Sequence, residues 1–203
     1  AIIFQLSLLE YLKLKSVVFI LLLLDCLGFI YDGLILTLGA LMSEGILYGT
    51  NFLRYILHAI LVPILIVFTG YALELTKIKL FINLAITLLF IILGLLAAIN
   101  IKLKIEEFGN ITRCKMHEDT PRWAKFIFTF INISSVIYMI IAGIILLKEK
   151  KDFSYLLSGF FMLIFSVIGP ASGNLDLTFI FSVYGEILMV IFLFIFFKNN
   201  SSE

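Results

Sequence analysis

Six long apolar runs, separated by shorter polar segments, make up most of this chain. A helix needs about 20 mainly apolar residues to cross the roughly 30 Å hydrocarbon core of a bilayer, and most of the runs reach that length. Because a helix satisfies its backbone hydrogen bonds internally, the pattern predicts an all-α integral membrane protein with about six transmembrane helices. The runs cover residues 16–42, 52–73, 80–100, 126–147, 153–168 and 177–197.

The N-terminal segment is too polar to form a span. Residues 1–15 mix isoleucine, leucine and phenylalanine with Gln5, Glu10 and Lys13. Such a mixture of apolar and charged residues is typical of helices that lie at a membrane surface. We therefore expect an interfacial helix over residues 1–15.

A second polar segment divides the chain into two halves. Residues 101–125 form the longest polar stretch and predict a loop between the third and fourth spans. The spans and their links leave no room for a soluble domain, so the whole chain, 1–203, is expected to be a single membrane domain. Spans 1–3 fall within residues 16–100, and spans 4–6 fall within residues 126–198.

Composition excludes a soluble single domain. Hydrophobic residues make up 62% of the chain and the mean hydropathy is +1.15, whereas soluble domains are roughly 45–50% apolar. The formal charge of +1, with no dense basic tract, gives no reason to expect nucleic acid as a partner. The expected partners are the lipid bilayer and a small-molecule or ion substrate. Association into a homo-oligomer or a larger membrane complex stays open.

The distribution of basic residues predicts the orientation of the chain. Six spans place both termini on the same side, and the segments on that side carry eight Lys or Arg residues against seven on the other. Cytoplasmic segments carry an excess of Lys and Arg, and short loops count most. This asymmetry favours a multi-pass protein with both termini in the cytoplasm.

Charged side chains inside the first two spans are the strongest indication of function. Asp25 and Asp32 lie in the first span, and Arg54 and His58 lie near the start of the second. Charges at the bilayer centre cost several kcal/mol and are found mainly where they pair or act. Asp25 and Asp32 are seven residues apart and share a helix face, as do Arg54 and His58, which are four apart.

The depth of these residues in the membrane predicts which of them meet. At about 1.5 Å per residue, Asp32 lies roughly 5 Å, and His58 roughly 6 Å, to the outer side of the centres of their spans. Their similar depth predicts contact between Asp32 and His58. Glu186, near the middle of the sixth span, adds another acid within the membrane.

Together these residues favour transport. We expect a small solute or ion to move through a polar cavity lined by spans 1, 2 and 6, with Asp32 and His58 as a proton-linked pair. Arg54 would bind an anionic group or gate the outer mouth of the cavity. Asp25 and Glu186 would continue the polar path. The alternative without turnover is that the charges only neutralise one another and hold the helices together.

Two further functions stay open. An intramembrane enzyme acting on a lipid or isoprenoid would use His58 as a base and Arg54 to hold a phosphate. Motifs of common hydrolases, metalloproteases and nucleotide-binding proteins are absent from the sequence. A non-catalytic subunit of a larger membrane complex would use the same charges for packing. Whether the chain is an enzyme is therefore undecided from its sequence.

Two short motifs add little to this interpretation. Cys114 and His117 have the spacing of two metal ligands, but no second half-site accompanies them, so no metal or cofactor is expected. Residues 169–174, which contain two glycines and a proline, either form a loop or break a helix inside the membrane.

Overall fold

The structure, a computed structural model of the chain, describes the backbone of residues 1–108, 111–171 and 175–200. Within these ranges it describes all side chains except those of residues 108, 167–171 and 175–180. Helices dominate, and one pair of short strands interrupts them. The elements are α1 (Ile2–Leu14), α2 (Val17–Leu38), a 3-10 turn η1 (Gly39–Leu41), α3 (Glu44–Ala72), α4 (Lys77–Ala98), β1 (Leu103–Phe108), β2 (Ile111–Met116), α5 (Arg122–Lys150), α6 (Ser154–Ala171) and α7 (Leu175–Asn200).

In the described part of the chain, five helices are long and apolar enough to cross a membrane. The helix over Ser154–Ser166 is apolar but shorter. The expected class, an all-α membrane protein, is confirmed, and the chain is a multi-pass membrane protein. The long apolar helices are Val17–Leu41, Glu44–Ala72, Lys77–Ala98, Arg122–Lys150 and Phe181–Asn200.

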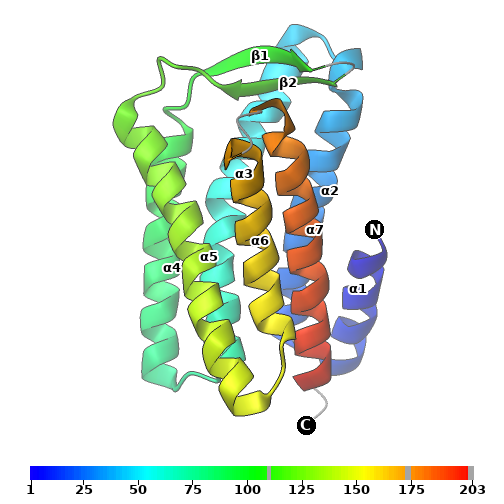
Figure 1. Cartoon of the computed structure of the whole chain (residues 1–203), viewed down its shortest axis with the longest axis vertical. Coiled ribbons are helices and arrows are strands. Elements are labelled where there is room, and N and C mark those ends of the chain that lie inside the picture. The colour runs from blue at the N-terminus through cyan, green and yellow to red at the C-terminus, as the bar shows by residue number, and fades with distance from the viewer. Residues whose placement is uncertain (109–110, 172–174, 201–203) are drawn as a thin grey trace.

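The long helices run side by side along the longest axis of the molecule (Figure 1). The strands β1 and β2 lie across one end, which we call the hairpin end. The C-terminus lies at the opposite end, which we call the terminal end. The helix expected over residues 1–15 is present as α1, which follows the terminal half of α2 in the antiparallel direction. Its location at a membrane interface stays a prediction.

Helix α3 begins at Glu44, well before the second apolar run. Glu44 lies in the first turn, where its charge suits the positive end of the helix dipole. Thr50 and Asn51 donate side-chain hydrogen bonds to carbonyl oxygens one turn back, those of Ile46 at 2.9 Å and Leu47 at 2.8 Å. These bonds satisfy the polar side chains within the helix. Polar residues that suggested a loop are therefore compatible with helix here.

The polar segment at residues 101–125 contains regular structure that its polarity does not predict. β1 and β2 pair antiparallel, with Leu103 opposite Met116. The sequence between the strands contains a Gly-Asn dipeptide flanked by alternating apolar and polar residues. That combination is a hairpin signal, which the loop interpretation overlooked because the charges of the segment dominated it.

The hairpin is attached to the ends of α2 and α3. The Cys114 backbone N–H donates to Asn51 Oδ1 at 3.2 Å. A side chain at Gly39 would collide with the carbonyl oxygen of Thr112, so glycine permits η1 to approach β2 closely. These contacts bury Cys114, which is 1% exposed. The hairpin therefore covers this end of the bundle as a packed element.

The buried apolar residues form two clusters. One lies under the hairpin and includes Leu47, Ala98 and Cys114. The other lies among α2, α3, α5, α6 and α7 toward the terminal end and is rich in aromatic rings. Its fully buried large side chains include Phe19, Phe68, Tyr155 and Phe196.

The link between the last two helices is only partly described. α6 continues to Ala171 and α7 starts at Leu175. Residues 172–174, with the side chains around them, lie outside the described residues. The alternatives of a loop or a broken helix at residues 169–174 therefore fall largely outside the described part of the chain.

Candidate functional site

One carboxylate oxygen, Asp32 Oδ2, joins α2 to α3. Arg54 Nε lies 3.2 Å from this oxygen, and His58 Nε2 lies 3.5 Å from it. Asp32 is 2% exposed, so its neighbours in the protein dominate its electrostatic surroundings. The contact expected between Asp32 and His58 is present because antiparallel α2 and α3 bring the two positions to one depth.

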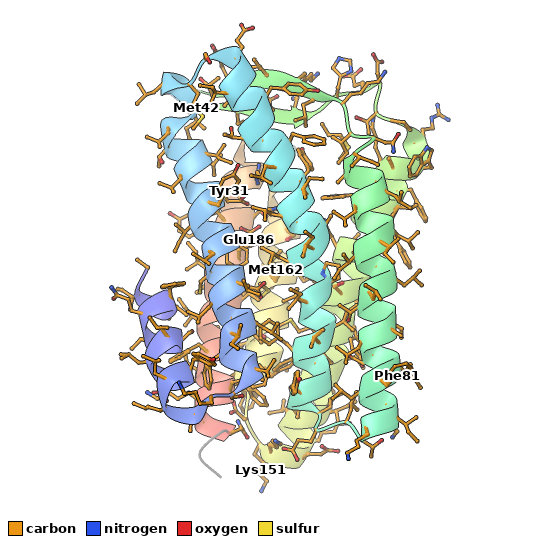
Figure 2. The ribbon with its side chains drawn as sticks, turned by 180° about the vertical axis from the view of Figure 1, so that it is seen from behind. Tyr31, Met42, Phe81, Lys151, Met162 and Glu186 are labelled. Atoms are coloured by element: carbon orange, nitrogen blue, oxygen red, sulfur yellow. The ribbon has the colours of Figure 1, made fainter. Side chains whose placement is uncertain are left out.

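Helix α7 brings a second carboxylate to the same histidine. Glu186 Oε1 lies 3.8 Å from His58 Nε2. The hydroxyl of Ser182, one turn earlier on α7, donates a hydrogen bond to Glu186 Oε1 at 3.3 Å. Glu186 is 4% exposed and lies near mid-height in the bundle, seen past α2 and α3 in Figure 2. His58 thus lies between carboxylates from two different helices.

The hydrogen bonds of the His58 ring determine where a proton is needed. His58 Nδ1 lies 3.1 Å from the backbone carbonyl oxygen of Arg54. A carbonyl oxygen only accepts hydrogen bonds, so Nδ1 carries a proton in this arrangement. In a neutral ring, Nε2 would then present a lone pair to Asp32 and Glu186. A favourable contact requires one more proton, either on Nε2 or on one of the two carboxyl groups.

Asp25 lies nearer the terminal end and outside this direct network. It is 2% exposed, and neither of its carboxyl oxygens has a hydrogen-bond partner among the described residues. Asp25 borders a small cavity of about 30 Å³ together with His58 and Glu186. A cavity of that size holds about one water molecule. Asp25 therefore faces the network across a space that water can bridge.

A larger cavity lies on another side of His58. Its volume is about 200 Å³, and its walls come from α3, α5, α6 and α7. The charged or titratable groups that line it are Arg54, His58 and Glu186; α5 and α6 contribute neutral residues to its described lining. The sequence predicted a cavity between spans 1, 2 and 6, whereas the described lining of the larger cavity comes from spans 2, 4, 5 and 6, and the first span lines only the small cavity. The helix order that produces these walls is a tertiary property.

Two polar residues of the larger cavity were missed from the sequence. Asn132 on α5 and Ser166 on α6 both line it. Each is an uncharged polar residue within an apolar run, which is a weaker signal than a charge. Attention to uncharged polar positions in the fourth and fifth runs could have identified them.

The group of Asp32, His58 and Glu186 also has the composition of a metal site. One potential ligand atom from each residue lies within 4.8 Å of the others. Ligands of a tetrahedral zinc are about 3.4 Å apart for bonds of about 2.1 Å. Arg54 already pairs with Asp32 Oδ2, the oxygen that faces His58, and its positive charge opposes a cation there. The arrangement fits an ion-pair network better than a metal centre.

Four of the five predicted site residues lie together, and Asp25 lies apart from them. Asp32, Arg54, His58 and Glu186 form one contiguous group from three helices. Asp25 reaches the group only through the small cavity. Their role in a pathway stays a prediction, and so does the alternative that they serve packing alone. No family model, curated protein or solved structure matches this chain.

Proposed function

We propose that this protein moves a small solute or an ion across the membrane in a proton-linked manner, with His58 at the centre of the proton path. The observation that carries the proposal is the position of His58 Nε2 between Asp32 and Glu186, while Nδ1 faces a carbonyl oxygen. This junction shares a proton among three groups. Histidine changes charge within the physiological pH range when its surroundings change, which suits reversible proton transfer.

The two cavities supply the proposed continuation of the path. Toward the terminal end, the small cavity leads from His58 and Glu186 to Asp25. An unpaired buried carboxylate is costly, so Asp25 holds its proton until a partner or water approaches. In the other direction, the larger cavity places Arg54 beside His58. Protons and solute would therefore meet at one histidine.

The terminal end is proposed to face the cytoplasm. The links and helix ends there carry basic residues, and Lys151 marks that end in Figure 2. Positive residues in short loops favour the cytoplasmic side. The hairpin would then face outward, with Arg54 on its side of His58. Cysteine labelling from each side of intact cells, at Lys151→Cys and Glu107→Cys, tests this orientation.

An intramembrane enzyme finds less support in the described residues. Ser166 and Ser182 line the same cavity as His58, but their hydroxyls donate to the Met162 carbonyl oxygen and to Glu186. A serine nucleophile needs its proton directed at the base that activates it, and neither hydroxyl donates to His58, the base expected for the enzyme. A purely structural role for the charges is tested by the same experiment as transport.

Proton flux in proteoliposomes tests the proposal. The purified protein is reconstituted into liposomes that contain a pH-sensitive dye. A potassium gradient with valinomycin then imposes a membrane potential that is negative inside the liposomes. We expect acidification with the native protein, and loss of at least nine-tenths of the flux in Asp32→Asn and His58→Ala. Equal flux in the native protein and both variants would remove the site from the mechanism, and absence of flux from the native protein would contradict proton conduction.

A matched control separates a specific loss from a general one. Glu44→Gln changes a carboxylate on the same helix as His58, but at an exposed position in the first turn. We expect its flux to equal that of the native protein. All variants are compared at equal reconstituted amounts and with matching elution volumes in gel filtration.

A further inference from the structure

The charges around the larger cavity indicate what kind of solute it accommodates. Its volume of about 200 Å³ corresponds to roughly seven water molecules at about 30 Å³ each. Arg54 and Glu186 bring opposite charges to its lining. Both are close to His58 or its partner Asp32, so the two charges lie near one another.

The guanidinium group of Arg54 has unused hydrogen-bonding capacity. Its Nε lies beside Asp32 Oδ2 but makes no hydrogen bond of acceptable geometry there. A guanidinium carries five N–H donors in a planar fork that matches a carboxylate. Among the described residues the one ion pair of Arg54 is with Asp32, through Nε. Arg54 can therefore hold an anionic group within the cavity while Asp32 remains at its side.

The opposite charge is held by an acid on α7. Glu186 accepts a hydrogen bond from the Ser182 hydroxyl and faces His58, and all three residues line the larger cavity. A carboxylate accepts several hydrogen bonds, so Glu186 has capacity for a further donor. An ammonium group placed there would be satisfied by Glu186 and the oxygen of Ser182.

Charge balance favours a solute that carries both an anionic group and an ammonium group. Asp32 and Glu186 are offset by Arg54 and a protonated His58, so the network is close to neutral without a solute. A solute with net charge would add an uncompensated charge within the membrane, which is expensive. A zwitterion pairs with both charged residues and leaves the total unchanged.

The remaining lining limits the rest of the solute. Val62, Ile133, Val136 and Leu163 provide an apolar wall. We propose that this cavity binds a zwitterionic α-amino acid with an apolar side chain of about the size of leucine, its carboxylate on Arg54 and its ammonium on Glu186. The inference rests on the proposed transport function and names the class of its substrate.

Binding of radiolabelled L-leucine to the purified protein in lipid nanodiscs tests this assignment without requiring transport. The competitors are 4-methylpentanoate, which lacks the ammonium, 3-methylbutylamine, which lacks the carboxylate, and 6-aminohexanoate, in which the two groups are far apart. We expect unlabelled leucine to compete at least tenfold better than each of them. Equal competition by 4-methylpentanoate would identify a simple anion site, and absence of leucine binding up to 10 mM would overturn the proposal.

Substitutions of the lining residues test whether leucine binds in the larger cavity. Arg54→Lys retains the charge but loses the planar fork, and Glu186→Gln removes the negative charge, so each should weaken leucine binding roughly tenfold or more. Ser134→Ala is the matched control, because Ser134 lies on α5 like Asn132 but lines a different groove. Unchanged binding in folded Arg54→Lys and Glu186→Gln would place leucine elsewhere and overturn the assignment.

Failure of this inference differs from failure of the proposed function. Proton flux that depends on His58, without leucine binding, would retain transport and exclude this substrate class. Leucine binding at Arg54 and Glu186, without flux in the presence of leucine, would retain the site and contradict transport.

Discussion

The middle of the bundle and its terminal end are built from the same helices but by different interactions. In the middle, α2, α3 and α7 meet through Asp32, His58 and Glu186, with a cavity on either side. Toward the terminal end, the same helices meet through aromatic rings, as in the pair Phe19 and Phe194. The polar region leaves space, whereas the aromatic region fills it.

This difference bears on the proposed transport. A solute in the larger cavity lies on the hairpin side of the aromatic cluster and cannot pass through packed rings. Interiors as dense as crystals do not yield continuously, so passage requires a second arrangement of the helices. In the proposed transport, the structure would therefore correspond to a state closed at the terminal end. The proposed pathway would alternate between this state and one in which the aromatic cluster separates.

Breaking the ion pair in the middle should have the largest effect on stability. Arg54→Met leaves Asp32 without its nearest cation. Loss of one partner of a buried pair costs about 3–5 kcal/mol because an uncompensated charge remains. We expect that decrease in the free energy of unfolding, measured by titration with denaturing detergent. Adding Asp32→Asn should restore at least half of the loss, and a double variant no more stable than Arg54→Met would contradict the pairing.

The long apolar helices and the polar middle differ in how far the sequence predicts them. The bilayer requires long apolar runs, so α2 to α5 and α7 could be recognised from composition alone. The contact of Asp32 with His58 followed from their depth in consecutive helices. By contrast, Asn132 and Ser166 reach the cavity through the order of helices around the bundle, which hydropathy does not contain.

The hairpin illustrates a different limit. Its alternating pattern and Gly-Asn dipeptide are local signals and were available in the sequence. Its position over Asn51 and Gly39 depends on contacts between distant segments. A local signal can thus predict a hairpin, but not the end of the bundle that it covers.

The aromatic end should respond to loss of volume more than to loss of polarity. Phe68 is fully buried and its ring lies 5.7 Å from that of Phe197. Phe68→Ala in a soluble core would cost about 3–5 kcal/mol. Helices that separate within lipid remain in an apolar medium, so we expect roughly 1–3 kcal/mol in the same detergent titration. Phe81→Ala is the control, because Phe81 is 72% exposed and should change stability by less than about 0.5 kcal/mol.

A single hydrogen bond inside the aromatic cluster should contribute less. The hydroxyls of Thr69 and Tyr155 are 2.8 Å apart and buried. Hydrogen bonds between membrane helices contribute about 0.6 kcal/mol on average. Tyr155→Phe should therefore lower the free energy of unfolding by about that amount, and combining it with Thr69→Val should add little. Additive losses from the two variants would show that the hydroxyls act independently.

The last comparison concerns the hairpin end, where burial should protect a thiol without any change in stability. Burial raises the pKa of Cys114, so less of it is thiolate at pH 8, and alkylation requires thiolate and access together. In a Cys26→Ala background we expect maleimide to label Cys114 at least tenfold more slowly than an exposed cysteine in Glu107→Cys, measured by mass spectrometry. Labelling should accelerate as pH rises, because more thiolate forms, yet remain slower than at the exposed position. Equal rates would mean that the hairpin separates readily from α3, and the contrast between a packed cover and a middle that contains cavities would then fail.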